Sequence, residues 1–289
     1  MRKRYQGQLF VLPAFILLVV LMIYPLFQTL LYSVVDVEIT GRVTNFAGFT
    51  HFHNVLQRYD FSRVMINTLL WVIATVGFEF TLALGVALFL NIEFRGRTFV
   101  QIVALIPWTI PSVVAGNTWR WIFQTDFGLA NSLLAQLGLG GLAQPWLSHP
   151  GFAYFSVLFA SIWRGYPFLM IMLLSGLKAI PHEQFEAAMI DGASSLQRFR
   201  YITVPNLKNI IVIVLILQII YAWNTFDVIF VITGGGPGGA TEVLGLFIYR
   251  LAFSIFNFSE AAAVSVMLLS LVFVLGVFRQ LLVRREGIQ

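Results

Sequence analysis

Two groups of polar and aromatic side chains interrupt stretches that are otherwise apolar. They are Trp223, Asn224 and Asp227, and Trp108, Asn117 and Trp119. Amide and carboxylate groups make planar, paired hydrogen bonds, and indole rings stack on the C–H faces of a sugar ring. The two groups therefore predict a cavity for a polyhydroxylated ligand. Aromatic residues near the ends of membrane helices are also typical of an interfacial belt, and this alternative stays open for Trp119.

Three charged residues lie within apolar stretches: Glu79, Arg164 and Asp227. A charge in the middle of a membrane costs about 2.5–3.5 kcal/mol on insertion scales, so each should face a partner or a water-filled cavity. Asn224 and Asp227 are three residues apart, so a continuous helix would place both on one face. Glu79 and Arg164 are expected near the centres of two spans, where they could form an ion pair with a structural role only.

Other chemistry has little support in the sequence. The run TGGGPGGATE (233–242) lacks the lysine that a phosphate-binding loop requires after its last glycine, so a flexible turn or a mobile outer loop that contacts another protein is expected there. The four histidines fall in expected loops, without enough further ligands for zinc. No serine or aspartate is placed beside a histidine in an apolar stretch, as a hydrolase would need. The chain is thus expected to catalyse nothing and to bind neither a metal nor a cofactor of its own.

The composition indicates a membrane protein. Of the 289 residues, 58% are hydrophobic and 11% are charged, whereas soluble domains average about 45–50% and about 25%. Six segments have the length and apolarity of a membrane-spanning helix. They are 9–31, 66–90, 99–117, 152–174, 207–232 and 262–283. Pro107 and Pro111 should kink the third. The predicted fold is therefore all-α, a polytopic membrane protein with six transmembrane helices in a single domain, 1–289.

The basic residues predict the orientation of these spans. With a cytoplasmic N-terminus, twelve Lys and Arg fall on the inner side and five on the outer side. This asymmetry follows the positive-inside rule, so both termini are expected in the cytoplasm. The apolar run 9–31 is longer than the core of a signal peptide, roughly 7–15 residues, and is expected to remain as the first span. The absence of cysteine excludes disulfides and thiolate metal sites.

The stretch 181–205 interrupts the apolar runs with polar residues, and its short helical segments are too short to cross a membrane and too apolar for a free loop. Pro181 suits the first position of a helix, and Gly192 supplies the positive φ that commonly ends one. A second short helix is expected to start near Ser194 or Ser195 with a hydroxyl cap, and Pro205 is expected to separate it from the fifth span. The result is a pair of short amphipathic helices on the cytoplasmic side. An interfacial helix that merely lies on the lipid headgroups is the alternative.

This stretch resembles the EAA loop of binding-protein-dependent ABC import permeases. The matching residues are Glu186, Ala187, Ala188, Asp191, Gly192, Ala193, Phe199, Ile202 and Pro205. The resemblance implies the type I ABC importer permease fold, with 181–205 as a cytoplasmic coupling helix between spans four and five. In such permeases this helix fits a groove on an ATP-hydrolysing subunit and passes its movement to the membrane helices. Glu186 is expected to anchor it through charge-assisted hydrogen bonds.

Further segments are similar to the carbohydrate-uptake subfamily, and to the first of its two membrane subunits, the maltose and glycerol-phosphate type. They are residues 223–253, IPWTIPSVVAGNTWRWIF (106–123) and IWRGYPF (162–168). The large outer domain of the maltose-type subunit is missing. The resemblance implies a non-catalytic permease subunit that imports a sugar, a mono-, di- or oligosaccharide, delivered by a solute-binding protein.

The resemblance also implies the partners of the chain. These are a second homologous permease subunit, two ATPase subunits or a homodimeric ATPase that use ATP and Mg, an extracytoplasmic solute-binding protein, and the lipid bilayer of a bacterial inner membrane, without nucleic acid. A polyol, a glycerol phosphate or an amino acid is an alternative cargo. A secondary transporter without ATP is the rival from another class, and it would carry an ion-coupling site at Glu79, Arg164 or Asp227.

Overall fold

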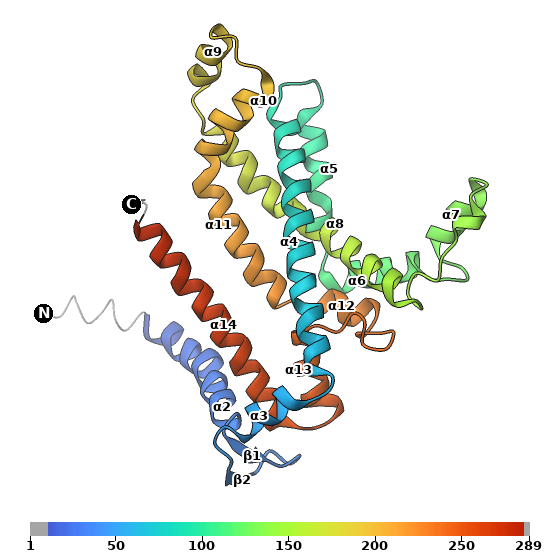
Figure 1. The fold of residues 1–289 in the computed structure, drawn as a ribbon, viewed down its shortest axis with the longest axis vertical. Helices are drawn as coiled ribbons and strands as arrows, with labels where there is room; N and C mark the ends of the chain where they lie inside the picture. The colour runs from blue at the N-terminus through green and yellow to red at the C-terminus, as the bar shows by residue number, and fades with distance from the viewer. Residues whose placement is uncertain (1–10, 286–289) are drawn as a thin grey trace, which may run out of the picture. The chain divides into compact units, whose positions relative to one another are not determined.

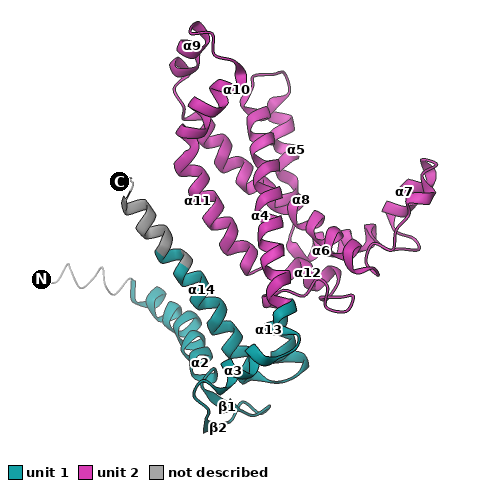
Figure 2. Ribbon diagram, in the orientation of Figure 1, with its two compact units in different colours: residues 1–63, 247–289 teal, residues 64–246 magenta. Residues whose placement is uncertain are grey.

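Helices dominate the computed structural model, which describes residues 11–285 (Figure 1). The basic cluster expected at the inner end of the first span, residues 2–4, lies outside the described residues. The chain divides into two compact units, one of residues 1–63 and 247–289 and the other of residues 64–246 (Figure 2). The first unit thus combines the two ends of the chain.

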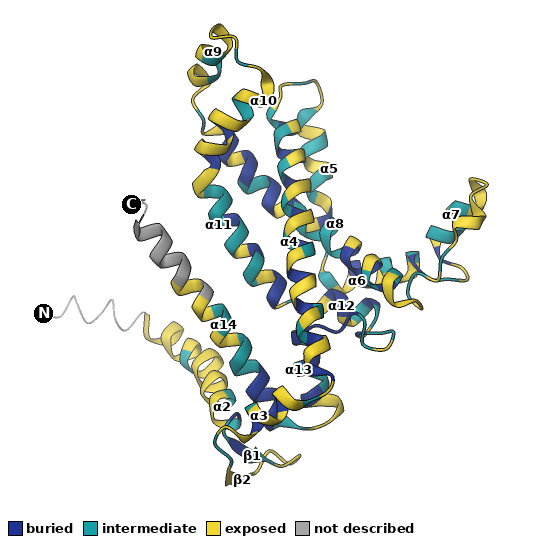
Figure 3. Ribbon diagram, viewed as in Figure 1, coloured by how far each residue is buried: buried dark blue, intermediate teal, exposed yellow. Residues whose placement is uncertain are grey.

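The first unit joins an N-terminal helix to the last helix of the chain. The N-terminal helix covers Val11–Tyr32 and contains the π-helical segment η1 (Val19–Ile23) and α2 (Tyr24–Tyr32). No residue of α2 is buried (Figure 3). The remaining elements are β1 (Val35–Val37), β2 (Val43–Phe46), α3 (Thr50–Gln57), η4 (Arg250–Ser254) and α14 (Phe258–Arg285). α14 packs on both α2 and α3.

A two-stranded antiparallel sheet departs from the predicted all-α fold. β1 and β2 pair with Val35 opposite Phe46 and Val37 opposite Val43. The hydroxyl of Ser259, in the first turn of α14, donates to the Val35 carbonyl (2.9 Å) and accepts from the Val37 N–H (3.0 Å). This side chain satisfies backbone groups at the edge of β1 and ties the hairpin to the start of α14.

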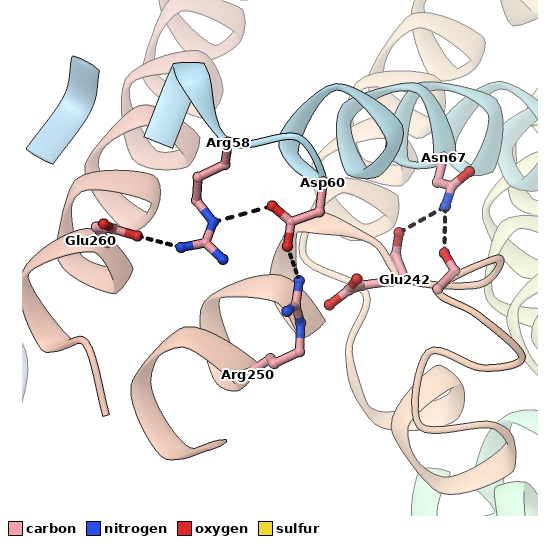
Figure 4. A network of polar contacts seen from close by, with 7 residues as sticks. Arg58, Asp60, Asn67, Glu242, Arg250 and Glu260 are labelled. Atoms are coloured by element: carbon pink, nitrogen blue, oxygen red, sulfur yellow. Dashed lines mark hydrogen bonds and ion pairs between the residues drawn. The ribbon is translucent and has the colours of Figure 1, made fainter. Parts of the chain in front are cut away.

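Four charged residues form a network within the first unit (Figure 4). Asp60, which is 1% exposed, accepts hydrogen bonds from Arg58 Nε (3.1 Å) and Arg250 Nη2 (2.7 Å). Arg58 Nη1 also donates to Glu260 Oε2 (3.0 Å). Burial alone would raise the pKa of Asp60, but the hydrogen bonds from Arg250 and Arg58 and their positive charges outweigh it and hold this pKa below its ordinary value. The network joins the loop before α4, η4 and the first turn of α14.

The second unit holds the long central helices. Its elements are α4 (Phe61–Asn91, from Val64 on), α5 (Arg97–Thr109), α6 (Ser112–Ile122), α7 (Leu129–Gln136), η2 (Gly140–Leu142), α8 (Pro150–Lys178), α9 (His182–Ile190), α10 (Ser195–Arg198), η3 (Phe199–Thr203), α11 (Val204–Trp223), α12 (Asp227–Ile232) and the start of α13 (Leu244–Tyr249). Apolar residues three or four positions apart form its core. Ala83 and Ala87 of α4, Leu169 and Leu173 of α8, and Leu207 of α11 are buried there.

Four helical stretches of residues 11–285 are long and apolar enough to cross a membrane. They are Val11–Tyr32, Phe61–Asn91, Pro150–Lys178 and Ser195–Trp223. α5 and α6 together would make a fifth, although the chain bends by 95° between them. The apolar part of α14, Phe258–Val274, is shorter. The predicted count of six spans stays a prediction.

The bend between α5 and α6 takes the place of the kinked third span predicted at 99–117. α5 ends at Thr109, and Ile110 has an extended backbone (φ −79°, ψ 128°). Pro111 disfavours a helical conformation of the residue before it, so the helix stops at this point and α6 starts in a new direction.

The predicted inner end of the fifth span is wrong, because Pro205 does not separate the second short helix from this span. One helix runs without interruption over Ser195–Trp223 and passes through the π-helical segment η3. A π-helical turn shifts the backbone hydrogen bonds by one residue, and here it stands directly before the first turn of α11, which contains the proline. The helix therefore accommodates a residue that lacks an N–H.

The outer end of the predicted fifth span is also wrong, since the helix stops at Trp223 and not at residue 232. The Asn224 side chain donates to the Ile220 carbonyl (2.8 Å), and the Thr225 hydroxyl donates to the Tyr221 carbonyl (3.3 Å). Such side-chain bonds to the carbonyls of the last turn compete with the helical hydrogen bonds and favour an end of the helix. α12 then starts anew at Asp227.

Candidate functional site

The second unit contains a cavity of about 570 Å³. Its wall is built from α4, α5, α8, α11 and α12 and from the residues that join α11 to α12. The polar lining residues are Thr75, Glu79, Ser161, Arg164, Gln218, Tyr221, Asn224, Thr225 and Asp227. Sites for small molecules commonly measure about 300–1,000 Å³ and combine apolar walls with a few polar groups. This cavity has both properties.

Helical spacing explains how α4 and α8 present polar groups to the cavity. Thr75 and Glu79 are four residues apart on α4 and therefore share one face. Ser161, Arg164 and Gly165 are three and four residues apart on α8 and share a face in the same way.

Glu79 is held by α8 and α11 together. The residue is 2% exposed, and Gln218 Nε2 donates to its Oε2. A Cβ atom on Gly165 would overlap the Glu79 carboxyl group, so the absence of a side chain there permits the close approach. Gln218 was missed by the sequence reasoning; its signal is a lone amide in the apolar run LILQII.

Arg164 lines the same cavity but takes a different partner. Its Nε donates to the Ile110 carbonyl at the bend between α5 and α6 (3.4 Å). Among the described residues no direct hydrogen bond joins Arg164 and Glu79, but the positive charge of Arg164 acts on the Glu79 carboxyl group through space.

Asp227 and Asn224 lie on different helical segments, contrary to the shared face that the sequence predicts. Asn224 is the C-cap of α11, whereas Asp227 is the first residue of α12. Both nevertheless line the cavity. Ser112 Oγ, at the start of α6, donates to Asp227 Oδ2 (2.9 Å) and fixes this carboxylate. The sequence reasoning did not identify Ser112, because its partner is more than a hundred residues away.

Aromatic rings form the apolar side of the cavity. Trp108 stacks on Phe168 with ring centroids 5.9 Å apart and an interplanar angle of 23°, and it remains 49% exposed. Tyr221 lies on the same lining and is 72% exposed. Exposed aromatic faces beside amide and carboxylate groups suit a ligand that has both C–H faces and hydroxyl groups.

Two hydroxyl groups on the cavity wall have no partner of their own. The Oγ1 of Thr75 and the Oγ of Ser161 are buried and make no hydrogen bond within the described chain. Buried hydroxyl groups are usually satisfied by the protein, by water or by a ligand. These two groups add hydrogen-bonding capacity to the part of the cavity near Glu79.

Three residues predicted for the cavity are found elsewhere in the second unit. Asn117 donates to the Val113 carbonyl within its own helix (3.0 Å). Trp119 packs edge-on against Trp163, with ring centroids 5.4 Å apart. Trp223 is buried, with 6% of its surface exposed. The lining of the described cavity includes none of the three.

In the stretch 181–205 the first predicted short helix is α9, whereas the second, α10, is the first turn of the continuous helix Ser195–Trp223. Gly192 lies between them with φ +78°, a conformation that favours glycine. Ser194 caps α10 in a reciprocal arrangement: its Oγ accepts from the Gln197 N–H (3.3 Å), and its own N–H donates to Gln197 Oε1 (2.7 Å). A fixed turn therefore joins the two helices.

Most residues of the predicted coupling motif are accessible. Glu186, Ala187, Asp191, Gly192 and Pro205 are exposed, and Ala188, Ala193 and Phe199 are half-buried. Glu186 Oε1 lies 3.4 Å from His182 Nδ1, one helical turn away. The small side chains at 187 and 188 leave the backbone of α9 open to close approach by another surface.

The glycine-rich loop after α12 is tied to α4 within the second unit. Asn67 Nδ2 donates to the Gly239 carbonyl (3.0 Å) and the Glu242 carbonyl (3.2 Å), as Figure 4 shows. The hydroxyls of Thr233 and Thr241 lie 2.7 Å apart and close the base of the loop. Thr241 also donates to the Gly236 carbonyl (2.9 Å). These bonds give a defined conformation to a run that the sequence describes only as a flexible turn.

Comparison with known proteins gives one family for most of the chain. The family model described as "Binding-protein-dependent transport system inner membrane component" matches residues 79–287. The trehalose/maltose transport system permease protein MalF of Thermococcus litoralis is 36% identical over 275 residues, which cover 94% of this chain and 91% of the relative. The sulfoquinovosyl glycerol transport system permease protein SmoG of Agrobacterium fabrum is 33% identical, with 93% of this chain and 87% of the relative covered.

A solved structure has the same fold. It is a chain of the crystal structure of a bacterial alginate ABC transporter in complex with an alginate pentasaccharide-bound periplasmic protein. The TM-score is 0.85 at 22% sequence identity, and the match covers 100% of this chain and 97% of the other. The described residues contain no cluster of three or more metal-ligating side chains.

Proposed function

The chain belongs to the family of binding-protein-dependent transport system inner membrane components, and from this membership we propose that it is one membrane subunit of an ATP-driven importer whose cargo is a sugar. The family consists of transport permease components, so the work of the chain is translocation. Relatives named for trehalose and maltose, for maltodextrin and for sulfoquinovosyl glycerol support a sugar or glycoside as the cargo.

The cavity of the second unit is the proposed sugar site, and its lining is the observation that carries the proposal. Trp108 offers a flat face to the ring, and Asn224 and Asp227 offer an amide and a carboxylate to hydroxyl groups. Ser112 holds Asp227 in place, so this carboxylate can accept from the cargo without first being ordered. Asn117, Trp119 and Trp223 have no direct part in this site.

The pair α9 and α10 is the proposed coupling element. An exposed helix with small residues at 187 and 188, followed by a glycine turn, can dock into a groove of an ATPase subunit. Glu186 would anchor it by charge-assisted hydrogen bonds. Because the helix of α10 continues into α11, a displacement of the docked pair would reach the cavity wall along one continuous helix. ATP binding and hydrolysis would then bias the cavity between two conformations.

In the proposed assembly this chain has six spans with both termini in the cytoplasm, the bent pair α5 and α6 counting as the third span and α14 as the sixth. Its other members would be a second permease subunit, two ATPase subunits that use ATP and Mg, and a solute-binding protein on the outer side. Coupling helices on the cytoplasmic side and a cavity open to alternate sides are what such an arrangement requires.

Reconstitution tests this function directly. The chain would be co-expressed with a second permease and an ATPase subunit of the same type of importer, placed in liposomes with a solute-binding protein, and supplied with labelled maltose or trehalose. Uptake should require ATP and the binding protein. An ATPase subunit with an inactivated nucleotide site serves as the control. Uptake by the purified chain alone, without nucleotide, would instead support a secondary transporter.

A further inference from the structure

We propose that Gly165 and Glu79 form an interlocked pair that positions Gln218 on the cavity wall. Gly165 would then be required for sugar binding although it offers no side chain to the cargo. This inference rests on the proposed function, since it assigns a role to residues around the proposed sugar site. Glu79 and Gly165 act here as positioning residues.

The interlock follows from the packing of α4 against α8. The Glu79 side chain is 2% exposed and extends from α4 to the backbone of α8 at Gly165. All three atoms nearest to a Cβ built on Gly165 belong to the Glu79 carboxyl group. Any other residue at 165 would displace that group. The carboxyl is the end of a flexible side chain beside the cavity, so we expect it to move there, away from the position in which it accepts from Gln218, while the backbone of α8 stays in place.

The consequence of such a displacement reaches α11 through Gln218. Gln218 is 9% exposed, and its Nε2 donates to Glu79 Oε2. With the carboxyl group displaced, the buried amide loses its partner and turns toward another acceptor. Gln218 lies one helical turn from Tyr221 on the lining of the cavity, so its orientation sets which groups the cargo meets there.

Two other glycines provide matched controls. Gly176 also lies on α8, and a Cβ there would meet the Ile210 and Leu207 side chains of α11 and no polar group. Gly77 lies on α4 two residues before Glu79, and a Cβ there would meet nothing within 4 Å. Gly176→Ala therefore creates a steric overlap on α8 at a place remote from the cavity lining. Gly77→Ala adds a methyl group without any overlap.

This chain has no cysteine, so one introduced thiol can be followed by its label on this chain after the subunits of the assembled transporter are separated. Leu217→Cys places one thiol on the cavity lining, and its labelling by a hydrophilic maleimide is measured with increasing maltose. The concentration that halves labelling reports occupancy of the cavity. In this background Gly165→Ala should raise it by about tenfold, the loss expected for one buried hydrogen bond, and Gly176→Ala and Gly77→Ala should leave it unchanged.

A double variant separates positioning from general damage. Glu79→Ala removes the group that a methyl at 165 would strike, so Gly165→Ala should cause no further change in that background. It should also restore assembly if Gly165→Ala alone fails to fold. An equal rise in the half-protecting concentration with and without Glu79 would overturn the inference, as would unchanged protection in Gly165→Ala. Absence of protection by maltose, trehalose and a wider sugar panel in the parent chain would instead count against the proposed sugar site.

Discussion

Replacing Asp60 by asparagine should loosen the part of the first unit that holds the hairpin, α3 and the start of α14. The change keeps the shape of the side chain but leaves Arg58 and Arg250 without the carboxylate they share. Removing one partner of a buried ion pair costs about 3–5 kcal/mol. The arginines are 25% and 32% exposed, so water can replace part of the loss, and we expect the lower end, about 3 kcal/mol. This corresponds to roughly a hundredfold increase in the opening equilibrium.

Hydrogen exchange measured by mass spectrometry on the full chain in lipid nanodiscs reports that opening. Peptides covering α3 and the first turn of α14 should exchange roughly a hundredfold faster in Asp60→Asn, and peptides of α8 should not change. Glu38→Gln is the matched control, because Glu38 is an exposed carboxylate in the hairpin of β1 and β2, within the same unit as Asp60. Unchanged exchange in Asp60→Asn, or an equal effect of Glu38→Gln, would refute the reasoning.

The pH dependence gives a second test of the same network. The pKa of Asp60 is lowered in the folded chain, so its stabilisation is fully present above the unfolded value of about 3.9 and is lost as the pH falls through the lower folded pKa. The protection of the α3 amides from hydrogen exchange should therefore decrease with falling pH only below about pH 4. In Asp60→Asn this acid-dependent decrease in protection should be absent. If the decrease persists in the variant, another titrating group causes it.

Three further predictions concern the second unit. Gly192→Val should leave the chain inserted and assembled but reduce uptake per ATP hydrolysed, because a β-branched residue is strained at φ +78°; normal coupling ratios would argue against the coupling role. Asp227→Asn should raise the sugar concentration for half-maximal uptake by about tenfold without changing co-purification of the ATPase, and an unchanged value would leave Asp227 a structural role. Gly176→Ala should lower thermal stability by about 1–3 kcal/mol, since its methyl group would overlap Leu207 and Ile210, and an unaltered melting temperature would contradict this packing.

Features set by neighbouring residues could be predicted from the sequence. Gly192 forms the turn between α9 and α10, and Ser194 caps α10. Each depends only on residues no more than four positions away in the sequence. The long apolar runs of α4 and α8 were equally clear. The two-stranded hairpin was missed, although the alternation in VDVEITGRVTNF, with a Gly at the turn, is a strand signal of the same local kind.

Features that depend on distant residues could not be predicted. Glu79 meets Gln218 across 139 positions, and the charge of Arg164 alone gave no indication of this hydrogen-bond partner. Asn224 and Asp227 were assigned to one helical face, but side-chain bonds end α11 between them. Trp119 and Trp223 are residues of a type that is typical of sugar sites. The packing of the helices, however, decides which indole ring faces the cavity.

The bend at Ile110 and Pro111 limits which substitutions this chain can accept in evolution. In a straight helix the Ile110 carbonyl would bond to the N–H four residues later, but the break leaves it available to the Arg164 guanidinium (3.4 Å). A cation in this environment needs such an acceptor. Loss of Pro111 should therefore be tolerated only where position 164 is uncharged, so the two positions are expected to covary among related permeases.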